Sequence, residues 1–290
     1  MRFRRAAGSA GLLLLALSGM AALLLRPPAA EASLAQRIAT LQTPTATMRI
    51  DCAILRAQRP LVLLVLGQSN AANHAEPGVQ PAPPLSLWHG GECYRAQAPL
   101  PGATGQGDSL WPWLNQALGG ELAGRPLLFA LLAVESTRLA DWTDAGPLHS
   151  QWQQLLQQLQ ASQLKVDLVL WQQGEADSRA ATTSDAYRQG LHKLQAQLHA
   201  AGVAAPIMLA RSSYCPPAQH QAIHAVQTEF ALQAAGFLAG PDTDVLQGPA
   251  RSGGCHFSRT GLQAAAASWV APLRDWASKQ QTMVKAQASH

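Results

Sequence analysis

The sequence predicts an α/β fold in which helices cover both faces of a parallel sheet. Two observations predict it: apolar runs of strand length recur along the chain, and amphipathic helical patterns separate them. The runs occupy residues 61–66, 127–134, 166–171 and 206–210, with a short last one at 236–239. Continuous apolar runs of this length are typical of strands that are buried on both faces. Strand and helix therefore alternate four or five times, as in a parallel α/β sheet.

The helical patterns place apolar residues every three or four positions, on one side of a helix. They are Trp152, Leu155, Leu156 and Leu159; Tyr187, Leu191, Leu194 and Leu198; Ile223, Val226 and Phe230; and Leu262, Ala266, Trp269, Leu273 and Trp276. Residues 71–109 are rich in Pro and Gly and interrupt the alternation. A long irregular insertion after a strand is expected to build a binding surface.

The first 32 residues are predicted to be a secretory signal peptide. Basic residues precede an apolar run, and Ala30-Glu31-Ala32 fits a small-residue cleavage site. An uncleaved membrane anchor is the alternative, because the uncharged run is near the length that spans a bilayer. Either way the rest is expected to be exported, periplasmic or extracellular, and to meet a membrane only through this segment. That rest divides into a lead-in segment at 33–57, one domain at 58–278 and a tail at 279–290.

The charge balance argues against a nucleic-acid partner. The chain has 21 Lys and Arg and 17 Asp and Glu, which gives a formal charge of +4. Residues 1–32 hold four of the basic residues and one of the acidic residues, so the remainder carries only +1. The sequence shows no basic stripe of the kind that binds phosphate backbones.

Four cysteines lie in the exported part: Cys52, Cys93, Cys215 and Cys255. An even number in an oxidising compartment favours two disulfides over a metal site. Of the three possible connectivities we expect Cys52–Cys93 together with Cys215–Cys255. His220 and His224 have the spacing of a zinc pair, but the sequence offers no third ligand. A solvated helix face is therefore favoured, and no metal is expected.

Polar residues follow the predicted strands. Gln68, Ser69 and Asn70 follow the first strand, Glu135 and Ser136 the second, and Gln173 and Glu175 the third, while His256 precedes the last helix. Because the carboxyl ends of parallel strands share one edge of a sheet, these residues are expected to converge. A serine nucleophile needs a histidine base and donors for the oxyanion. Ser69, His256 and the Gln173 amide are suited to these roles.

Four segments in this order resemble the SGNH hydrolases, in particular the branch with sialate O-acetylesterase-like and carbohydrate acetylesterase domains. They are GQSNA at 67–71, WQQGEAD at 171–177, GPDTD at 240–244 and CHFSRTGL at 255–262, with weaker matches in DWTDAG at 141–146 and GATGQGDSLW at 102–111. The resemblance covers residues 58–275. The lipase elbow G-x-S-x-G is not met, since residue 71 is Ala, and this disfavours the α/β-hydrolase fold.

The resemblance implies a flavodoxin-like three-layer α/β/α sandwich, the SGNH hydrolase fold. It implies Ser69 as nucleophile and His256 as base. The oxyanion hole would combine the Ser69 backbone amide, the Gln173 side chain and a second-strand loop amide at Ser136. Gln68 and Asn70 flank the serine and are expected to bind substrate. No metal or organic cofactor is implied.

One departure from the family concerns the acid. The family usually carries Asp three residues before the catalytic His, where this chain has Gly253. That carboxylate orients the imidazole, and its loss without replacement costs about 10⁴ in rate. Glu175 ranks first as a replacement, ahead of Asp242, Asp244 or a backbone carbonyl. Glu175 is equally suited to support the Ser69 turn.

A second departure is Glu135-Ser136, where the family usually has a Gly pair. A carboxylate that points into the site there would disfavour negatively charged sugars. The expected function is that of an exported serine esterase that removes O-acetyl groups from a carbohydrate. The alternative is a catalytically weakened or inactive protein of the same fold that binds glycans in polysaccharide assembly, and Gly253 is the feature that supports it.

Overall fold

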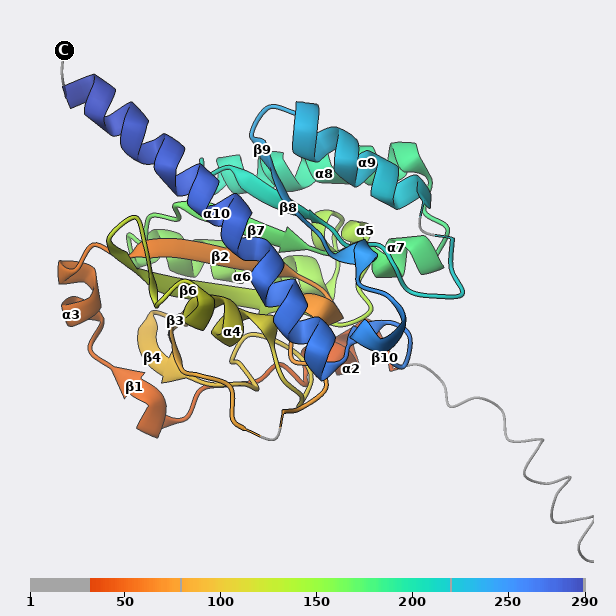
Figure 1. The fold of residues 1–290 in the computed structure, drawn as a ribbon, viewed down its shortest axis with the longest axis horizontal. Helices are drawn as coiled ribbons and strands as arrows, with labels where there is room; N and C mark the ends of the chain where they lie inside the picture. Colours follow the sequence, from red (N-terminus) through yellow and green to blue (C-terminus); the bar gives the residue numbers. More distant parts are fainter. Residues whose placement is uncertain (1–31, 79, 220, 289–290) are drawn as a thin grey trace, which may run out of the picture. The chain divides into compact units, whose positions relative to one another are not determined.

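The fold is built on one large β-sheet with helices on both faces (Figure 1). The computed structural model describes residues 32–288 apart from 79 and 220, so the predicted signal segment lies outside the described residues except for Ala32. In the described part of the chain, no helix combines the length and the apolar character needed to cross a bilayer.

The sheet runs mostly parallel. Its strands lie in the order β1 (Arg49–Ile50), β4 (Glu92–Ala96), β3 (Leu85–His89), β6 (Arg125–Ala133), β2 (Leu61–Gly67), β7 (Leu168–Gln172), β8 (Ile207–Arg211) and β9 (Phe237–Asp242), and β5 (Glu121–Leu122) pairs with β6. Parallel pairing runs without a break from β3 to β9. In the central strand β2, Leu63 lies opposite Phe129 on one side and Leu168 on the other. The predicted parallel α/β class is confirmed.

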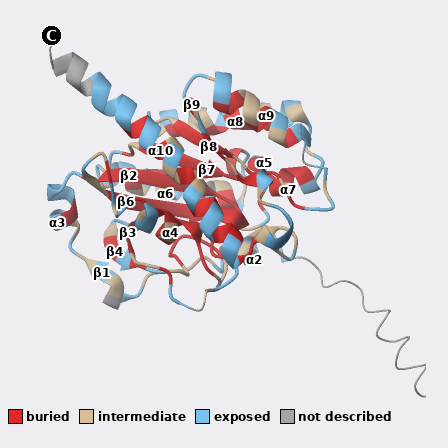
Figure 2. Cartoon of the chain, in the orientation of Figure 1, coloured by how far each residue is buried: buried red, intermediate tan, exposed pale blue. Residues whose placement is uncertain are grey.

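Helices form the outer two layers. They are α2 (Leu34–Ile38), α3 (Cys52–Ala57), α4 (Leu110–Ala117), α5 (Leu139–Thr143), α6 (Pro147–Ala161), α7 (Glu175–Arg179), α8 (Ser184–Ala200), α9 (Gln221–Gln233) and α10 (Arg259–Ala288). Side chains of β2 alternate between two cores. Leu61, Leu63 and Val65 pack with α4 and α10, whereas Val62, Leu64 and Leu66 pack with α5, α6, α8 and α9. Figure 2 shows the buried strands between these layers, which confirms the predicted three-layer sandwich.

The insertion at 71–109 is not wholly irregular. It contains the antiparallel hairpin of β3 and β4, which extends the sheet beyond β6. His89 pairs with Glu92, so the turn is Gly90-Gly91, and both glycines have positive φ. A two-residue hairpin turn of this type requires positive φ at both positions, which glycine adopts without strain. The Gly-Gly pair between two alternating segments is the local signal for this hairpin.

Both flanking segments contribute to the domain. The lead-in segment 33–57 supplies β1, which pairs with β4, and a disulfide joins Cys52 to Cys93 in that strand. At the other end, α10 continues through Ala288, so the predicted tail is helical as far as the structure describes it. Figure 1 shows the end of α10 extending past the sheet.

Candidate active site

Ser69 lies at the carboxyl end of the central strand, in the short 3-10 helix η2 (Ser69–Ala71). The strand ends at Gly67, whose backbone lies so close to β7 that a Cβ atom would collide with the carbonyl oxygen of Gln172. The N–H of Ala71 donates to the carbonyl of Gln68 at 2.8 Å and closes the turn. Glycine therefore allows the chain to turn at the sheet edge and to present Ser69 there.

His256 lies in a small second sheet formed by β10 (Arg251–Ser252) and β11 (His256–Phe257). Gly253 and Gly254 lie in the turn between the two strands, with φ of 59° and 80°. β11 contacts η2, and Nδ2 of Asn70 donates to the carbonyl of Cys255 at 3.1 Å. The structure therefore brings the serine turn and the histidine hairpin together, although they are far apart in sequence.

Two further interactions fix the histidine hairpin. Arg251 is buried and donates from Nη1 to the carbonyl of Cys255 at 2.9 Å. Its Nη2 donates to the carbonyl of Thr243 at 2.7 Å. The disulfide Cys215–Cys255 ties the hairpin to the loop after β8. Both predicted disulfide pairings are confirmed.

The His256 ring is neutral at physiological pH. Burial lowers its pKa to about 4, and the neighbouring His74 and Arg251 also lower this pKa. Glu135 acts in the opposite direction and raises it. A neutral imidazole can accept a proton, which a general base must do, but a low pKa makes the base weak.

Glu175 supports the serine turn. It is 1% exposed, and its Oε1 accepts hydrogen bonds from Nδ2 of Asn70 at 2.7 Å and from Oγ of Ser212 at 2.9 Å. Burial raises the pKa of Glu175 to about 7. Asn70 in turn holds the hairpin of His256. The structure thus connects Glu175 to His256 through Asn70 and the backbone, and no hydrogen bond between the two side chains is present in the described part.

Gln68 and Gln173 join the same buried network. Oε1 of Gln68 accepts from the N–H of Ala176 at 3.1 Å, which links the serine turn to α7. Nε2 of Gln173 donates to the carbonyl of Thr137 at 2.9 Å and to Oδ2 of Asp177 at 2.6 Å. Both amide hydrogens of Gln173 are therefore engaged with the scaffold in this structure.

In the described part of the chain, the N–H groups of Ser69 and Ser136, which lie near the site, have no hydrogen-bond partner. Ser69 begins η2, so its N–H makes no bond within that helix. Ser136 follows β6 in an exposed turn with φ of 53°, a left-handed conformation that is uncommon outside glycine. These N–H groups can receive an oxyanion.

A pocket of about 480 Å³ opens beside His256. Its lining consists of Asn73, His74, Ala75, Glu76, Pro77, Gln106, Gly107, Ser252, Gly253 and His256. Most of these residues come from the insertion after β2, so this insertion forms most of the pocket wall. His74 is a site residue that the sequence does not mark, whereas Glu135 is expected at the site from its place after the second predicted strand. A single histidine in a Pro-rich and Gly-rich segment has no pattern that marks it, except its closeness to the GQSN turn.

His224, Asp242 and Asp244 are the one group in the described part with the composition of a metal site. The Asp244 carboxylate accepts two backbone N–H groups of the loop after β8. Oδ2 of Asp242 lies 3.0 Å from Nε2 of His224 and 3.5 Å from Nε of Arg211. Protein groups engage these oxygens, so the group is an ion-pair network. His220, the other member of the predicted histidine pair, lies outside the described residues.

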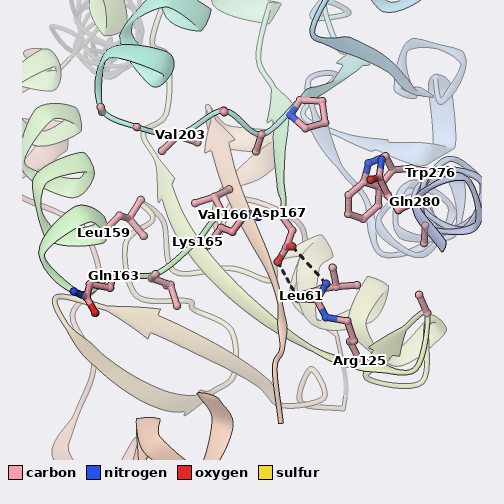
Figure 3. Close-up of a pocket in the computed structure, with 18 of the residues that line it drawn as sticks. Leu61, Arg125, Leu159, Gln163, Lys165, Val166, Asp167, Val203, Trp276 and Gln280 are labelled. Atoms are coloured by element: carbon pink, nitrogen blue, oxygen red, sulfur yellow. Dashed lines mark hydrogen bonds and ion pairs between the residues drawn. The ribbon is translucent and has the colours of Figure 1, made fainter. Parts of the chain in front are cut away.

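A larger cavity of about 950 Å³ lies at the opposite edge of the sheet (Figure 3). Leu61 and Arg125 line it at the amino ends of their strands, together with Asp167, which precedes β7. Asp167 accepts a hydrogen bond from the N–H of Val62 at 2.9 Å and pairs with Arg125. The described lining contains no Ser, Cys or His, and its one carboxylate, Asp167, is engaged by Val62 and Arg125.

Residues 114–247 match the family model described as carbohydrate esterase, sialic acid-specific acetylesterase. The predicted family resemblance is confirmed. The segment that matches this acetylesterase family includes Gln173 and Glu175, while Ser69 and His256 lie on either side of it. No curated protein matches the chain at a significant level.

Two solved structures share the fold of the acetylesterase-like chain. A protein from Arabidopsis thaliana superposes with a TM-score of 0.58 at 14% identity, over 73% of this chain and 96% of that one. A mutant of Axe2, an acetyl-xylooligosaccharide esterase from Geobacillus Stearmophilus, superposes with a TM-score of 0.50 at 14% identity, over 73% and 94%. At this identity the two likenesses concern the fold.

Proposed function

We propose that the chain is an exported serine esterase that removes O-acetyl groups from a carbohydrate. The hydrogen bond from Asn70 to Cys255 carries the proposal, because it joins the turn of Ser69 to the hairpin of His256 at the carboxyl edge of the sheet. The match to a family of acetylesterases supports the reaction. The two disulfides support export, since such bonds persist in oxidising compartments.

The reaction follows from these groups. Oγ of Ser69 attacks the carbonyl carbon of the acetyl ester while His256 accepts the hydroxyl proton. The N–H groups of Ser69 and Ser136 stabilise the oxyanion, and Gln173 would join them if it released Thr137 or Asp177. The tetrahedral intermediate expels the sugar oxygen, which takes the proton from His256. Water then attacks the acetyl-enzyme, again with His256 as base, and acetate leaves as His256 returns the proton to Oγ of Ser69.

The test of the function is acetate release from an acetylated oligosaccharide by the purified protein. An esterase produces acetate in proportion to time and enzyme concentration. Binding of the glycan without acetate release would instead support the alternative, a glycan-binding protein of the same fold. Gly253 is the observation that favours this alternative, because the residue leaves His256 without its usual acid.

The charge of the pocket predicts a neutral sugar. Glu76 lines the pocket, Glu135 lies beside it, and the described lining includes no Lys or Arg. A carboxylate about 10 Å from a like charge is destabilised by about 1 to 2 kcal/mol at an effective dielectric constant near 20. We therefore expect kcat/KM for an acetylated xylo-oligosaccharide to exceed that for an O-acetylated sialic acid by about 5- to 30-fold.

This preference is measured with the two substrates at low and high salt. Because salt screens the repulsion, the ratio should shrink as ionic strength rises. Glu76→Gln removes one charge and should also reduce the ratio. Equal kcat/KM for both substrates at low salt would contradict the assignment of a neutral sugar.

A further inference from the structure

The base lacks the carboxylate that a serine esterase usually places beside it. A Cβ atom at position 253 would meet open space, but glycine supplies no charge there. Glu175 is engaged by Asn70 and Ser212. In the described part of the chain, no ion pair or hydrogen bond joins a carboxylate to the His256 ring. The imidazolium that forms during the reaction needs another source of negative charge.

Glu135 lies next to the pocket, and contacts with His74 and Thr104 hold it there. Its Oε2 lies 3.6 Å from Nε2 of His74. Its backbone N–H donates to Oγ1 of Thr104 at 3.0 Å, and the same Oγ1 lies 3.1 Å from Nε2 of His74. Thr104 is fully buried and its own N–H donates to Ala133 at the end of β6. Thr104 therefore holds both Glu135 and His74.

His74 links this anchor to the base. The ring centroids of His74 and His256 lie 5.3 Å apart with an angle of 33° between the planes, and both rings line the pocket. Burial lowers the pKa of His74, so its ring is uncharged at neutral pH. An uncharged ring does not neutralise the Glu135 carboxylate. The negative charge of Glu135, 3.6 Å from Nε2 of His74, therefore raises the pKa of the His256 ring, although burial lowers that pKa by more.

We propose that Glu135, held beside His256 by His74 and Thr104, is the positioning residue that replaces the absent acid. The proposal rests on the esterase function above. When Ser69 gives its proton to His256, the carboxylate of Glu135 stabilises the imidazolium through space, and no bond to Glu135 forms or breaks. The contact with His74 keeps the His256 ring in place, which is the other task of the usual acid.

The first experiment removes the charge with Glu135→Gln. We expect kcat to fall by about 10- to 100-fold, less than the loss of a hydrogen-bonded acid, because the charge acts without direct contact. Removal of a nearby negative charge lowers the pKa of His256, so the acidic limb of the kcat/KM profile should move to lower pH. Glu135→Asp keeps the charge and should recover most of the rate. An unchanged kcat and an unmoved pH profile in Glu135→Gln would overturn the proposal.

The second experiment restores the family residue with Gly253→Asp. Residue 253 has a positive φ, which Asp adopts more readily than most residues. If Glu135 replaces the acid, the loss caused by Glu135→Gln should shrink to less than about threefold in the Gly253→Asp background. The same loss in both backgrounds would show that Glu135 acts independently of the missing acid and would overturn the proposal. Circular dichroism and thermal unfolding check that each variant folds.

Ser69→Ala separates this proposal from the function on which it rests. Activity that survives in Ser69→Ala would refute the serine mechanism itself. An inactive Ser69→Ala together with a fully active Glu135→Gln would refute only the role of Glu135.

Discussion

Replacement of Ser69 by Ala is expected to lower kcat for acetate release by at least about 10³-fold. The variant lacks the oxygen that attacks the ester, and loss of the nucleophile in a serine hydrolase removes nearly all of the covalent pathway. The fold should be unaffected, because Oγ of Ser69 has no hydrogen-bond partner in the described part of the chain. The backbone N–H of residue 69 remains, so binding of the acetyl group should change little.

The measurement is the initial rate of acetate release, with an aryl acetate as a second substrate. Ser278→Ala is the matched control, because Ser278 is exposed on α10 and its Oγ bonds only to the helix backbone at Asp275. We expect that control to retain the full rate. More than about a tenth of the rate in Ser69→Ala would rule out Ser69 as the nucleophile.

Glu175→Gln is expected to stabilise the protein at alkaline pH relative to the natural chain. Burial raises the pKa of Glu175 from 4.5 to about 7 in the folded state. The folded state then binds the proton more tightly than the unfolded state, so this residue costs stability as pH rises from 4.5 to 7. The cost is about 3 kcal/mol at pH 8. Gln removes it and keeps an oxygen for the hydrogen bonds of Asn70 and Ser212.

Urea unfolding of both proteins at pH 4.5 and pH 8 measures the effect. The difference in unfolding free energy between variant and natural chain should increase by about 3 kcal/mol over this range. The comparison with the natural chain is needed because His74 and His256 also make stability depend on pH. Their pKa values are lowered in the folded state, so the free energy of unfolding decreases as pH falls and these residues are protonated. The exposed Glu121→Gln is the control and should show no such increase. If the difference in unfolding free energy did not change with pH, ionisation of Glu175 would not destabilise the folded state.

The same variant also tests the role of Glu175 in catalysis. A hundredfold loss of kcat in Glu175→Gln, with a normal kcat in Glu135→Gln, would identify Glu175 as the acid. The reverse result would leave Glu175 as the support of Asn70, which is where its hydrogen bonds place it.

The parallel core of the fold was predictable because each central strand is a continuous apolar run. β2 is buried along its whole length, so its sequence needs no polar residue and differs plainly from its surroundings. The hairpin of β3 and β4 lies near the edge of the sheet, and both strands mix buried residues with residues that are partly or fully exposed. Its short strands occur among prolines and glycines, and only the Gly90-Gly91 turn marks them.

The candidate site could be predicted where a residue stands in a local motif. Ser69 and His256 stand in such motifs, and the structure brings them together. His74 could not be found in this way, because its place beside His256 depends on how the insertion folds. Glu135 was expected at the site from its place after the second strand, but its contact with His74 was not. For Gln173 the motif predicts an oxyanion donor. It does not predict the hydrogen bonds to Thr137 and Asp177, because these depend on how the chain folds around Gln173.

The disulfide Cys215–Cys255 makes the position of His256 depend on the oxidation of two cysteines. It closes a loop with a sequence separation of 40 residues, which in the chain-entropy model lowers the entropy of the unfolded chain by an amount equivalent to about 4 kcal/mol. The disulfide therefore anchors the residue next to His256, and such bonds persist in oxidising compartments. In the proposed mechanism, a molecule that folded without this oxidation would hold His256 by the hydrogen bonds of Asn70 and Arg251 alone, so its activity would depend on the compartment in which it folded.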